Sequence, residues 1–485
     1  MRRLLLAIGS LLLTASAAGQ DASTPSFADS ALVQLDLPAP VRPPRLPYLD
    51  AAAYLGEVRG AWVYDFGTPG WPDGWSPFGI DPGRVGVQLD GLLLDDPVTG
   101  RPAYELLPYD KLISLDRKGI VLGRPEGMSG ALSDYRSNRP VTEMVYRSTS
   151  TGLQQVSVVH AQTRRAGAAG DIQYLFGYAG AGSRGEYDGS ELERKRQILL
   201  RVQRNGRRLS WEIGDMFNRH RVGAHSGVEP FAGFTYESIY VRLGATVGNP
   251  SAKRELERND SWIRLTLPGT GTSLKTSRTT STLVYRNTPD TTEARVTRFA
   301  TELRQPFFGG RFHLGVKGHT DSYRADSAWT RQTETRSELL GSLEGRHRIG
   351  SGRVSWSAGA LMADLGVPGP DGSTDPAVEP VFSVDLEWMG GVVRPFIHSR
   401  NGVRLQSAAD LFGFGETYQP LGDRLEGRQA VDELGVSFRP GWLHVLASVA
   451  ASRTTDGAER VFNATNDTLS VAPYTGLRTR TSATG

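Results

Sequence analysis

The stretch RVGVQLDGLLLDDPVTG, residues 84–100, carries the hairpin signature on which the interpretation of this chain turns. Residues 85–89 alternate apolar and small or polar side chains, which predicts a half-buried strand. Asp90-Gly91 is a tight-turn dipeptide, and residues 92–94 predict the returning strand. Residues 95–100 then predict a loop rich in acidic, proline and glycine residues.

The residues around this hairpin predict a small α+β domain. Residues 106–115, LLPYDKLISL, predict a short helix that packs back on the hairpin. Short apolar runs and helical stretches alternate across residues 51–130, and residues 62–77 are dense in Gly, Pro and Trp. We therefore expect a domain over residues 49–130.

From about Thr142 the apolar residues follow a period close to two, which is typical of strands. The clearest unit is QILLRVQRNGRRLSWEI, residues 197–213, with Asn205-Gly206 at its centre. Asn-Gly is the preferred dipeptide of a type I′ turn, so this unit predicts a β-hairpin. Its apolar faces are formed by Ile198, Leu200 and Val202 before the turn, and by Leu209, Trp211 and Ile213 after it.

The same alternation recurs along the rest of the chain. Apolar residues repeat at every second position in residues 263–267, 382–388, 434–438 and 443–449. Short turns, such as 306–310 and 350–352, alternate with longer polar loops, such as 364–376. Short turns at one end and longer loops at the other are typical of an outer-membrane barrel, whose strands have about 9–11 residues across the bilayer.

The N-terminus has the features of a bacterial export signal. Met1-Arg2-Arg3 is a charged start, residues 4–13 are apolar, and Ala15-Ser16-Ala17 is a small-residue cleavage site. We expect residues 1–19 to be removed. Residues 20–48 include a proline-rich segment at 37–47 and predict a semi-extended tether.

Composition narrows the class of protein. The chain has 485 residues, of which 39% are hydrophobic and 22% charged, which excludes a helical membrane protein. It has no cysteine, which excludes disulfides, thiol catalysis and thiolate metal sites. The net charge is +3, and its arginines are interleaved with acids rather than gathered in a basic run, so no nucleic-acid partner is predicted.

Arginine dominates the basic residues, because only six lysines occur, at 111, 118, 195, 253, 275 and 317. An arginine-lined lumen for anionic ligands is one interpretation, and a compositional bias of the source is the simpler one. Neither excludes a β-rich exported fold.

Two architectures match an exported chain of amphipathic strands. Helices and closed barrels are the structures that satisfy their backbone groups in lipid, so a membrane-embedded chain of this pattern has to be a barrel. A periplasmic sandwich or propeller is the alternative, but the alternation runs for over 300 residues without a linker or a blade-length repeat. We predict a mainly β fold: a transmembrane antiparallel β-barrel over residues 131–485, preceded by the small α+β domain.

The 84–117 segment resembles the plug domain of TonB-dependent outer-membrane receptors. The plug of that family has a strand ending in Leu/Ile-Asp-Gly, then a turn ending in Asn-Asp-Pro, then a Leu/Ile-Pro stretch. The matching elements here, in order and spacing, are Leu89-Asp90-Gly91, Leu94-Asp95-Asp96-Pro97, Gly100 and Leu106-Leu107-Pro108. Residues 55–60, LGEVRG, are similar to the opening element of a plug.

The chain also departs from that family. Residues 62–82 replace an Arg-Gly-rich hairpin, and the expected closing strand is GIVLG at 119–123. Residues 31–35 are the candidate energiser box. The family has 22 strands, whereas this barrel region predicts roughly 14 to 16. Residues 480–485 lack a terminal aromatic, so the chain is either a truncated or a divergent relative.

The resemblance implies a receptor or transporter of the cell outer membrane that captures an unidentified small ligand, with a TonB-like periplasmic energiser and membrane lipid as partners. It implies that Asp90-Gly91 and Asp95-Asp96 are structural corners of the plug. No cofactor, metal or enzymatic activity is predicted. The alternatives are a passive porin-like barrel with a plug remnant, a secreted or surface-held binding protein and, more remotely, a periplasmic hydrolase.

Other motifs are better explained without a ligand. Residues 180–185, GAGSRG, match a dinucleotide glycine pattern but precede no helix, which favours a hairpin loop. His220 and His225 have the wrong spacing for a helical metal site, and residues 371–375 lack a full calcium ligand set. The tryptophans at 62, 71 and 75, near Tyr64, could stack on sugars, although packing within the small domain is the simpler interpretation.

Overall fold

The structure is a computed structural model. It describes residues 51–55, 61–64 and 70–484, except 79, 81–82, 84, 119, 136, 150–151, 166–169, 186, 225–227, 231–244, 288–289, 327–332, 368–374, 405, 415–419, 421–426, 439–444 and 464–467. The predicted export segment, the tether, the candidate energiser box and most of the 55–60 element lie outside the described residues.

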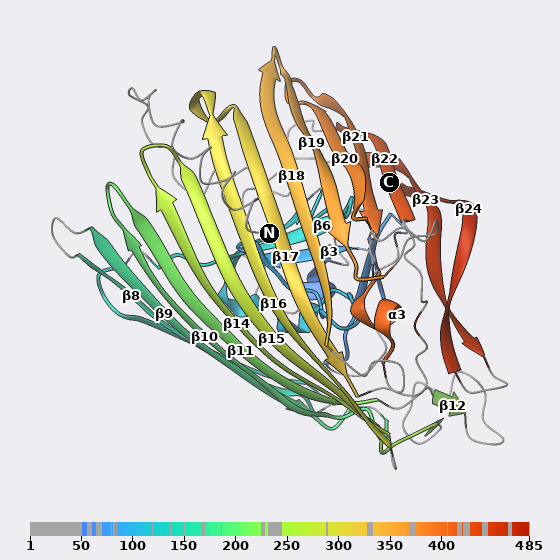
Figure 1. The fold of residues 1–485 in the computed structure, drawn as a ribbon. Helices are drawn as coiled ribbons and strands as arrows, with labels where there is room; N and C mark the ends of the chain where they lie inside the picture. Colours follow the sequence, from blue (N-terminus) through green and yellow to red (C-terminus); the bar gives the residue numbers. More distant parts are fainter. Residues whose placement is uncertain are drawn as a thin grey trace.

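Most of the chain forms one antiparallel sheet of 16 strands, here called the barrel sheet (Figure 1). Almost every strand pairs with its sequence neighbour, so the sheet is a long meander, as the alternating pattern predicts. Its strands are β7 (Val141–Ser148), β8 (Gln154–Arg165), β9 (Asp171–Ser183), β10 (Leu192–Asn205), β11 (Ser210–Gly223), β14 (Lys253–Leu267), β15 (Thr272–Asn287), β16 (Asp290–Phe307), β17 (Phe312–Ala325), β18 (Glu334–Ile349), β19 (Gly352–Asp364), β20 (Ala377–Trp388), β21 (Val393–Arg404), β22 (Gly427–Phe438), β23 (Val445–Asn463) and β24 (Thr468–Thr484).

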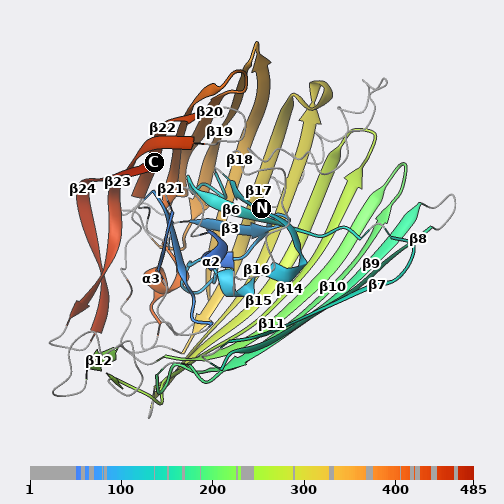
Figure 2. The ribbon, with the colours of Figure 1, turned by 180° about the vertical axis from the view of Figure 1, so that it is seen from behind.

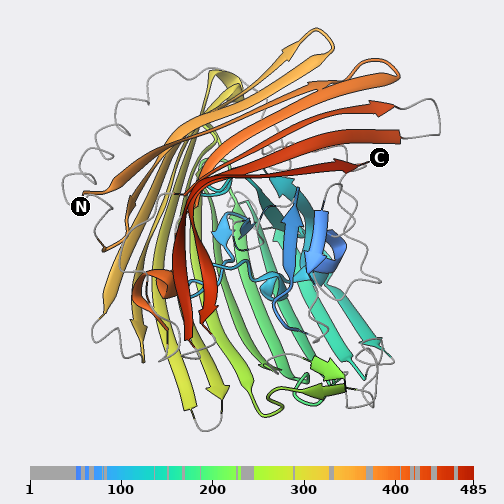
Figure 3. The same ribbon diagram turned by 90° about the vertical axis from the view of Figure 1, so that its right-hand side faces the viewer.

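The sheet is strongly curved and encloses the N-terminal elements on its concave side (Figure 3). Strands β7 and β24 stand at its two ends, and among the described residues no pairing joins them. Between β11 and β14, the short strands β12 (Val228–Pro230) and β13 (Ala245–Val247) pair with each other. The number of strands agrees with the 14 to 16 predicted from the sequence.

The two ends of the sheet differ, as the sequence predicts. At one end β10 joins β11 through residues 206–209, and β18 joins β19 through 350–351. At the other end the connections include residues 184–191, 224–252, 365–376 and 405–426. The first is called the short-turn end and the second the long-loop end. The chain enters β7 at the short-turn end.

Most strands are longer than the 9–11 residues expected from the sequence; β15, for example, has 16 residues. The outward face of β14 explains this difference. Ile263, Leu265 and Leu267 form an exposed apolar band toward the short-turn end. Farther along, the outward residues are charged: Arg219 of β11 pairs with Glu255 of β14 at 2.8 Å. The strands therefore continue beyond their apolar band toward the long-loop end.

The two faces of the barrel sheet differ in the same way along other strands. In β20, Val378, Phe382 and Val384 are exposed on the outside, whereas Glu379 and Asp385 are buried on the inside. The outer face of β20 is therefore apolar and uncovered, and its inner face carries buried acids. A water-soluble sheet protein would show the reverse arrangement.

The plug-like domain lies on the concave side of the barrel sheet (Figure 2). Its sheet has the strand order β4-β3-β6-β5, in which β3 and β6 are parallel. A second pair, β1 with β2, and the short helix α2 pack beside it, and Trp75 of β2 donates to the carbonyl of Leu55 at 3.2 Å. The elements are α2 (Ala51–Leu55), β1 (Ala61–Tyr64), β2 (Gly74–Pro77), β3 (Gly86–Leu89), β4 (Leu92–Leu93), β5 (Leu112–Lys118) and β6 (Gly127–Leu132).

Two local predictions in the plug-like domain are wrong. Residues 106–115 do not form one helix: two single 3₁₀ turns, η3 (Tyr104–Leu106) and η4 (Tyr109–Lys111), lead into β5. Pro108 lacks an N–H, and Leu107 before it has an extended backbone, so the helix cannot continue. Residues 119–123 are not the closing strand either, because Leu122 and Gly123 have positive φ in a turn that leads to β6.

Gly91 provides a test of the β3–β4 turn. Its φ is +87°, and a Cβ there would lie 2.5 Å from a Glu302 carboxylate oxygen of the barrel sheet. We expect Gly91→Val to lower the free energy of unfolding by about 2 kcal/mol, from backbone strain and displacement of Glu302. The measurement is urea unfolding in detergent micelles, followed by tryptophan fluorescence.

The matched control is Gly269→Val, because an added Cβ at this turn glycine meets no atom within 4 Å. Equal stability losses in the two variants would contradict a specific fit of Gly91 against the sheet.

Candidate functional site

The Asp90-Gly91 turn connects β3 and β4 as the sequence predicts. Asp90 and Gly91 have φ of 48° and 87°, and Leu89 pairs with Leu92. Positive φ at both central positions defines a type I′ turn, which explains the Asp-Gly dipeptide. The Asp90 side chain also accepts from the backbone N–H of Leu132 at 3.2 Å, so it ties the turn to the end of β6.

Cations of the barrel sheet bind the outside of this turn. Arg264 of β14 and Lys275 of β15 both donate to the carbonyl oxygen of Asp90, the latter at 2.9 Å. Lys317 of β17 donates to the carbonyl of Gly91 at 2.9 Å and to Gln88 at 3.0 Å. Three strands therefore direct cations at the two carbonyl groups of one turn.

Asp95 is the centre of a buried charge cluster. Arg298 of β16 lies 2.5 Å from one oxygen of Asp95 and also pairs with Asp321 of β17 at 2.7 Å. Arg336 of β18 pairs with the other oxygen of Asp321 at 2.9 Å. Burial alone would raise the pKa of Asp95, but the charges of Arg298 and Arg124 outweigh it and hold that pKa well below its usual range.

A second arginine binds the backbone on either side of Leu94. Arg258 of β14 donates to the carbonyl oxygens of Leu93 at 2.7 Å and Asp95 at 2.6 Å. Asp260, two residues along the same strand, holds the guanidinium at 2.8 Å and neutralises it. Both side chains are fully buried. Their charges are tolerated there because the guanidinium and the carboxylate are paired with each other and the guanidinium also binds the two carbonyl groups.

Asp96 shapes the next loop. Its carboxylate accepts from the N–H of Val98 at 3.0 Å and from the Thr99 hydroxyl at 2.9 Å. Its carbonyl accepts from the N–H of Gly100, whose φ of +66° closes the loop. Pro97 is buried within it. We call residues 96–103 the apical loop, because it lies on the side of the plug-like domain toward the long-loop end.

Two further ion pairs attach the plug-like domain to other strands. Glu126 binds Arg400 of β21, which also pairs with Asp385 of β20 at 3.1 Å. Asp110 pairs with Arg147 of β7 at 2.5 Å. The charges that hold the domain therefore come from both halves of the barrel sheet.

Lys111 is a buried cation of the plug-like domain. Its ammonium donates to Ser157 of β8 at 3.2 Å, and its chain passes over Gly177 of β9, where a Cβ would lie 2.4 Å away. Burial lowers the pKa of Lys111 to about 8, and the nearby charge of Asp110 offsets part of that effect.

The predicted plug-signature residues all lie together in this region. Asp90, Gly91 and Asp95 contact the barrel sheet directly, and Asp96, Pro97 and Gly100 form the apical loop. Leu89 and Leu94 are buried in the core beneath them. Pro108 precedes η4, and its carbonyl accepts from the N–H of Lys111. Their assignment as structural corners of a plug stays a prediction.

The sequence interpretation missed the partners of these residues on the barrel sheet. Arg254, Arg258 and Arg264 lie at even positions of β14 and point inward, opposite the apolar residues at 263, 265 and 267. That alternation of charged and apolar positions could have indicated which side chains of β14 point inward. It does not show which plug-like residue each arginine contacts, because the partners are distant in the sequence; Arg258 and Asp95, for example, are 163 residues apart.

Other candidate sites gain no support. His220 is buried, residues 180–183 belong to β9, and His225 and 371–374 lie outside the described residues. Within the described residues, no group of three or more His, Asp or Glu could hold a metal ion. Trp75 is buried in the core, Trp71 packs against Leu192, and Trp62 is exposed.

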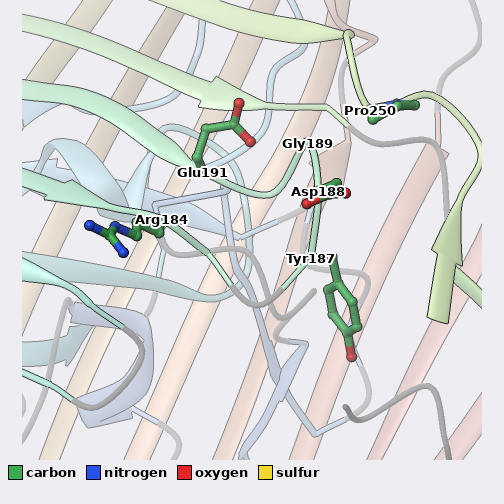
Figure 4. Close-up of a pocket in the computed structure, with 6 residues that line it drawn as sticks. All are labelled: Arg184, Tyr187, Asp188, Gly189, Glu191 and Pro250. Atoms are coloured by element: carbon green, nitrogen blue, oxygen red, sulfur yellow. The ribbon is translucent and has the colours of Figure 1, made fainter. Parts of the chain in front are cut away.

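A shallow cavity of about 520 Å³ opens at the long-loop end (Figure 4). It lies beside the connection from β9 to β10 and is lined by Arg184, Tyr187, Asp188, Gly189, Glu191 and Pro250. Its position at the rim of the sheet makes it part of the surface that a ligand approaching from this end would meet.

Comparison with known proteins identifies the fold. No family model matches the chain, and no curated protein matches its sequence. Among solved structures, the copper transporter OprC has a TM-score of 0.66 at 12% identity, over 89% of this chain and 72% of its own. The hemophore receptor HasR of Serratia marcescens, solved with its hemophore HasA and heme, has a TM-score of 0.64 at 11% identity, over 90% and 76%.

The FrpB iron transporter of Neisseria meningitidis has a TM-score of 0.61 at 12% identity, over 87% of this chain and 72% of its own. These proteins are TonB-dependent outer-membrane receptors. The chain therefore has the plug-and-barrel fold of that class, as the 84–117 segment predicts. Among its described residues, no helix has the length and apolar character needed to cross a membrane.

The Asp95–Arg298 contact can be tested by a double-mutant cycle. We expect Asp95→Asn to lower the free energy of unfolding by about 3 kcal/mol, because Arg298 loses one of its two acids while buried. Arg298→Leu should cost more, since it leaves both Asp95 and Asp321 short of a partner. The double variant should be more stable than the sum of the single losses by about 1–3 kcal/mol, measured by urea unfolding in micelles.

The control for this cycle is Arg295→Gln on the same strand, whose side chain is 70% exposed and whose loss should change stability by less than about 0.5 kcal/mol. Strictly additive losses from Asp95→Asn and Arg298→Leu would contradict a direct contact.

Lys111 predicts a pH dependence. Below about pH 8 its amine is charged in both folded and unfolded chains, and burial of that charge costs stability. Between about pH 8 and 10.5 the folded chain releases the proton first, so stability rises with pH. Relative to Lys111→Met, the wild type should gain about 2 kcal/mol between pH 7 and about pH 9.5 in urea unfolding. Parallel pH curves for the two proteins would contradict the lowered pKa.

Proposed function

We propose that the protein is a ligand receptor or transporter of the cell outer membrane, reached through an N-terminal signal peptide at residues 1–19. One observation carries this proposal: an N-terminal domain is held by buried ion pairs inside a sheet that is apolar outside and charged inside. The solved structures with the same fold are outer-membrane receptors, which supports the same location.

The outer face of the sheet supports insertion into lipid. A chain in water would cover residues such as Ile263, Phe382 and Leu434, which are exposed on three different strands. In a bilayer these side chains contact acyl chains, and the charged outward residues of β11 and β14 then lie beyond the hydrocarbon region. Insertion requires every strand to be paired at both sides, so closure of the sheet is the property to measure.

The proposed mechanism is capture at the long-loop end, followed by release when the plug-like domain rearranges. The domain is attached by polar contacts, including those of Asp90, Asp95 and Glu126, and by buried apolar clusters that it shares with the inner face of the barrel sheet. Polar contacts are short-ranged and can exchange with water one at a time, so a pull from the periplasmic side can loosen one part of the domain first. We propose that a TonB-like energiser supplies that pull and that it acts on residues 20–48.

The ligand is proposed to be a small molecule or metal complex. The similar structures are described as transporters or receptors for copper, for iron, for heme through a hemophore, and for the siderophore alcaligin. No catalytic role and no cofactor are part of the proposal.

Fractionation tests the location and closure of the barrel. We expect the expressed protein in the sarkosyl-insoluble outer-membrane fraction, with faster migration in electrophoresis when unheated, because a closed barrel resists unfolding by detergent. A soluble periplasmic protein whose migration does not change on heating would overturn the proposal and favour a secreted β-protein.

Uptake separates energised transport from passive diffusion in the same cells. The probes are labelled copper, heme and ferric alcaligin, compared between the full chain and a variant lacking residues 20–48. Loss of uptake in the deletion, with unchanged membrane insertion, is expected for a coupled receptor. Uptake that persists unchanged would instead identify a porin-like barrel.

A further inference from the structure

The connection between β21 and β22 folds back into the concave side of the barrel sheet. Its described part, residues 406–414, is here called the strap, and it contains the helix α3 (Ala408–Phe412), labelled in Figure 2. Ser407 and Asp410 form a reciprocal capping box at the start of α3. All five residues of the helix are buried, although the strap belongs to a long surface connection.

The strap lies directly on the apical loop of the plug-like domain. The N–H of Ala409 donates to the carbonyl of Val98 at 2.9 Å. A Cβ on Gly100 would lie 3.1 Å from that of Ser407, so the absence of a side chain at Gly100 permits this approach. Val98 and Ala103 share one apolar cluster with the strap residues Ala408, Ala409, Leu411 and Phe412.

The strap is also bound to the barrel sheet. The Tyr323 hydroxyl of β17 donates to the carbonyl of Gly413 at 2.6 Å, and its ring stacks on Phe412 with centroids 5.8 Å apart. Arg336 of β18 donates to the carbonyl of Gln406 at 2.8 Å. Arg336 also binds Asp321, which binds Arg298, the partner of Asp95. One chain of charged contacts therefore runs from the strap to the plug-like domain.

We propose that the strap is a displaceable lid that covers the apical loop until a ligand entering from the long-loop end replaces it. The inference rests on the proposed function, because it assigns this end to ligand entry. A helix of five residues has no stability of its own, so α3 depends on tertiary contacts such as those just described. A ligand that competes for the carbonyl of Val98 or for the Tyr323 ring therefore displaces it.

Displacement of the lid has two consequences. It uncovers a mixed surface of Val98, Ala103 and the Tyr323 ring, which can receive a compact ligand with both apolar and hydrogen-bonding groups. It also removes the Gln406 carbonyl from Arg336, which shifts that guanidinium toward Asp321 and weakens the hold of Asp321 on Arg298. Ligand entry and attachment of the plug-like domain are thereby coupled.

The absence of cysteine from the chain makes lid opening directly measurable. Ala103→Cys places a single thiol at a position 1% exposed beneath the strap. Ala161→Cys, fully buried on the inside of β8 and not in the apolar cluster of the strap, reports general unfolding. The measurement is the rate of maleimide labelling of the purified full chain in micelles, which requires no ligand.

Two variants weaken the lid in different ways. Ala409→Pro removes the N–H that bonds Val98, at a helix position in the first turn, where proline is tolerated. Tyr323→Phe removes the hydroxyl that bonds Gly413 and keeps the stacked ring. Each should speed labelling of the thiol at 103 by about fivefold to tenfold, the change in opening that loss of one ordinary hydrogen bond produces. Labelling at 161 should not change.

The matched control is Tyr174→Phe, which removes a tyrosine hydroxyl bonded to Gln162 on the outer face of β9. It should leave both labelling rates unchanged. Equal rates at 103 in wild type and both lid variants, or a parallel rise at 103 and 161, would overturn the lid. Because labelling is independent of transport, a receptor that takes up ligand but fails this test keeps the proposed function and loses only the lid.

Discussion

The structure depends on matching buried charge between the plug-like domain and the inner face of the barrel sheet. Asp95 and Glu126 are buried acids, and Arg298 and Arg400 supply the opposite charges from distant strands. Buried ions are tolerated only when they are paired and hydrogen-bonded, so each set fixes the position of the other. The arginine-rich composition is thereby explained in part: several arginines attach the domain rather than bind a free anion.

The same requirement shapes the backbone. The Asp90-Gly91 turn presents two carbonyl groups to Arg264, Lys275 and Lys317, and an added side chain at Gly91 would meet Glu302. A type I′ turn suits this role because its tight loop carries little side-chain bulk and leaves its carbonyls accessible. The strap extends the arrangement to the long-loop end, where Arg336 contacts both the strap and Asp321.

Much of the fold could be predicted from the sequence, because hairpins are local. The Asp90-Gly91 and Gly350-Ser351 turns form as predicted, and the period of two sets the faces of the strands. The 197–213 hairpin also forms, but the predicted Asn205-Gly206 type I′ turn is wrong, because Arg204 pairs with Trp211 and residues 206–209 make the connection. The failures occur where local pattern and tertiary context compete. The leucines of residues 106–115 suggest a helix, but Pro108 and the pairing of β5 with β6 favour turns and a strand. The partners of Asp95 were not predictable, since no periodicity relates residues 95 and 298.

We propose that the plug-like domain, held by these charges, closes the lumen of a membrane-inserted barrel. The most direct measurement is ion conductance across a planar lipid bilayer, comparing the full chain with a variant that lacks residues 51–132. We expect no current from the full chain and steady channel currents from the variant, because removing the domain leaves a polar, water-filled interior. Steady currents of the same size in both proteins would contradict it.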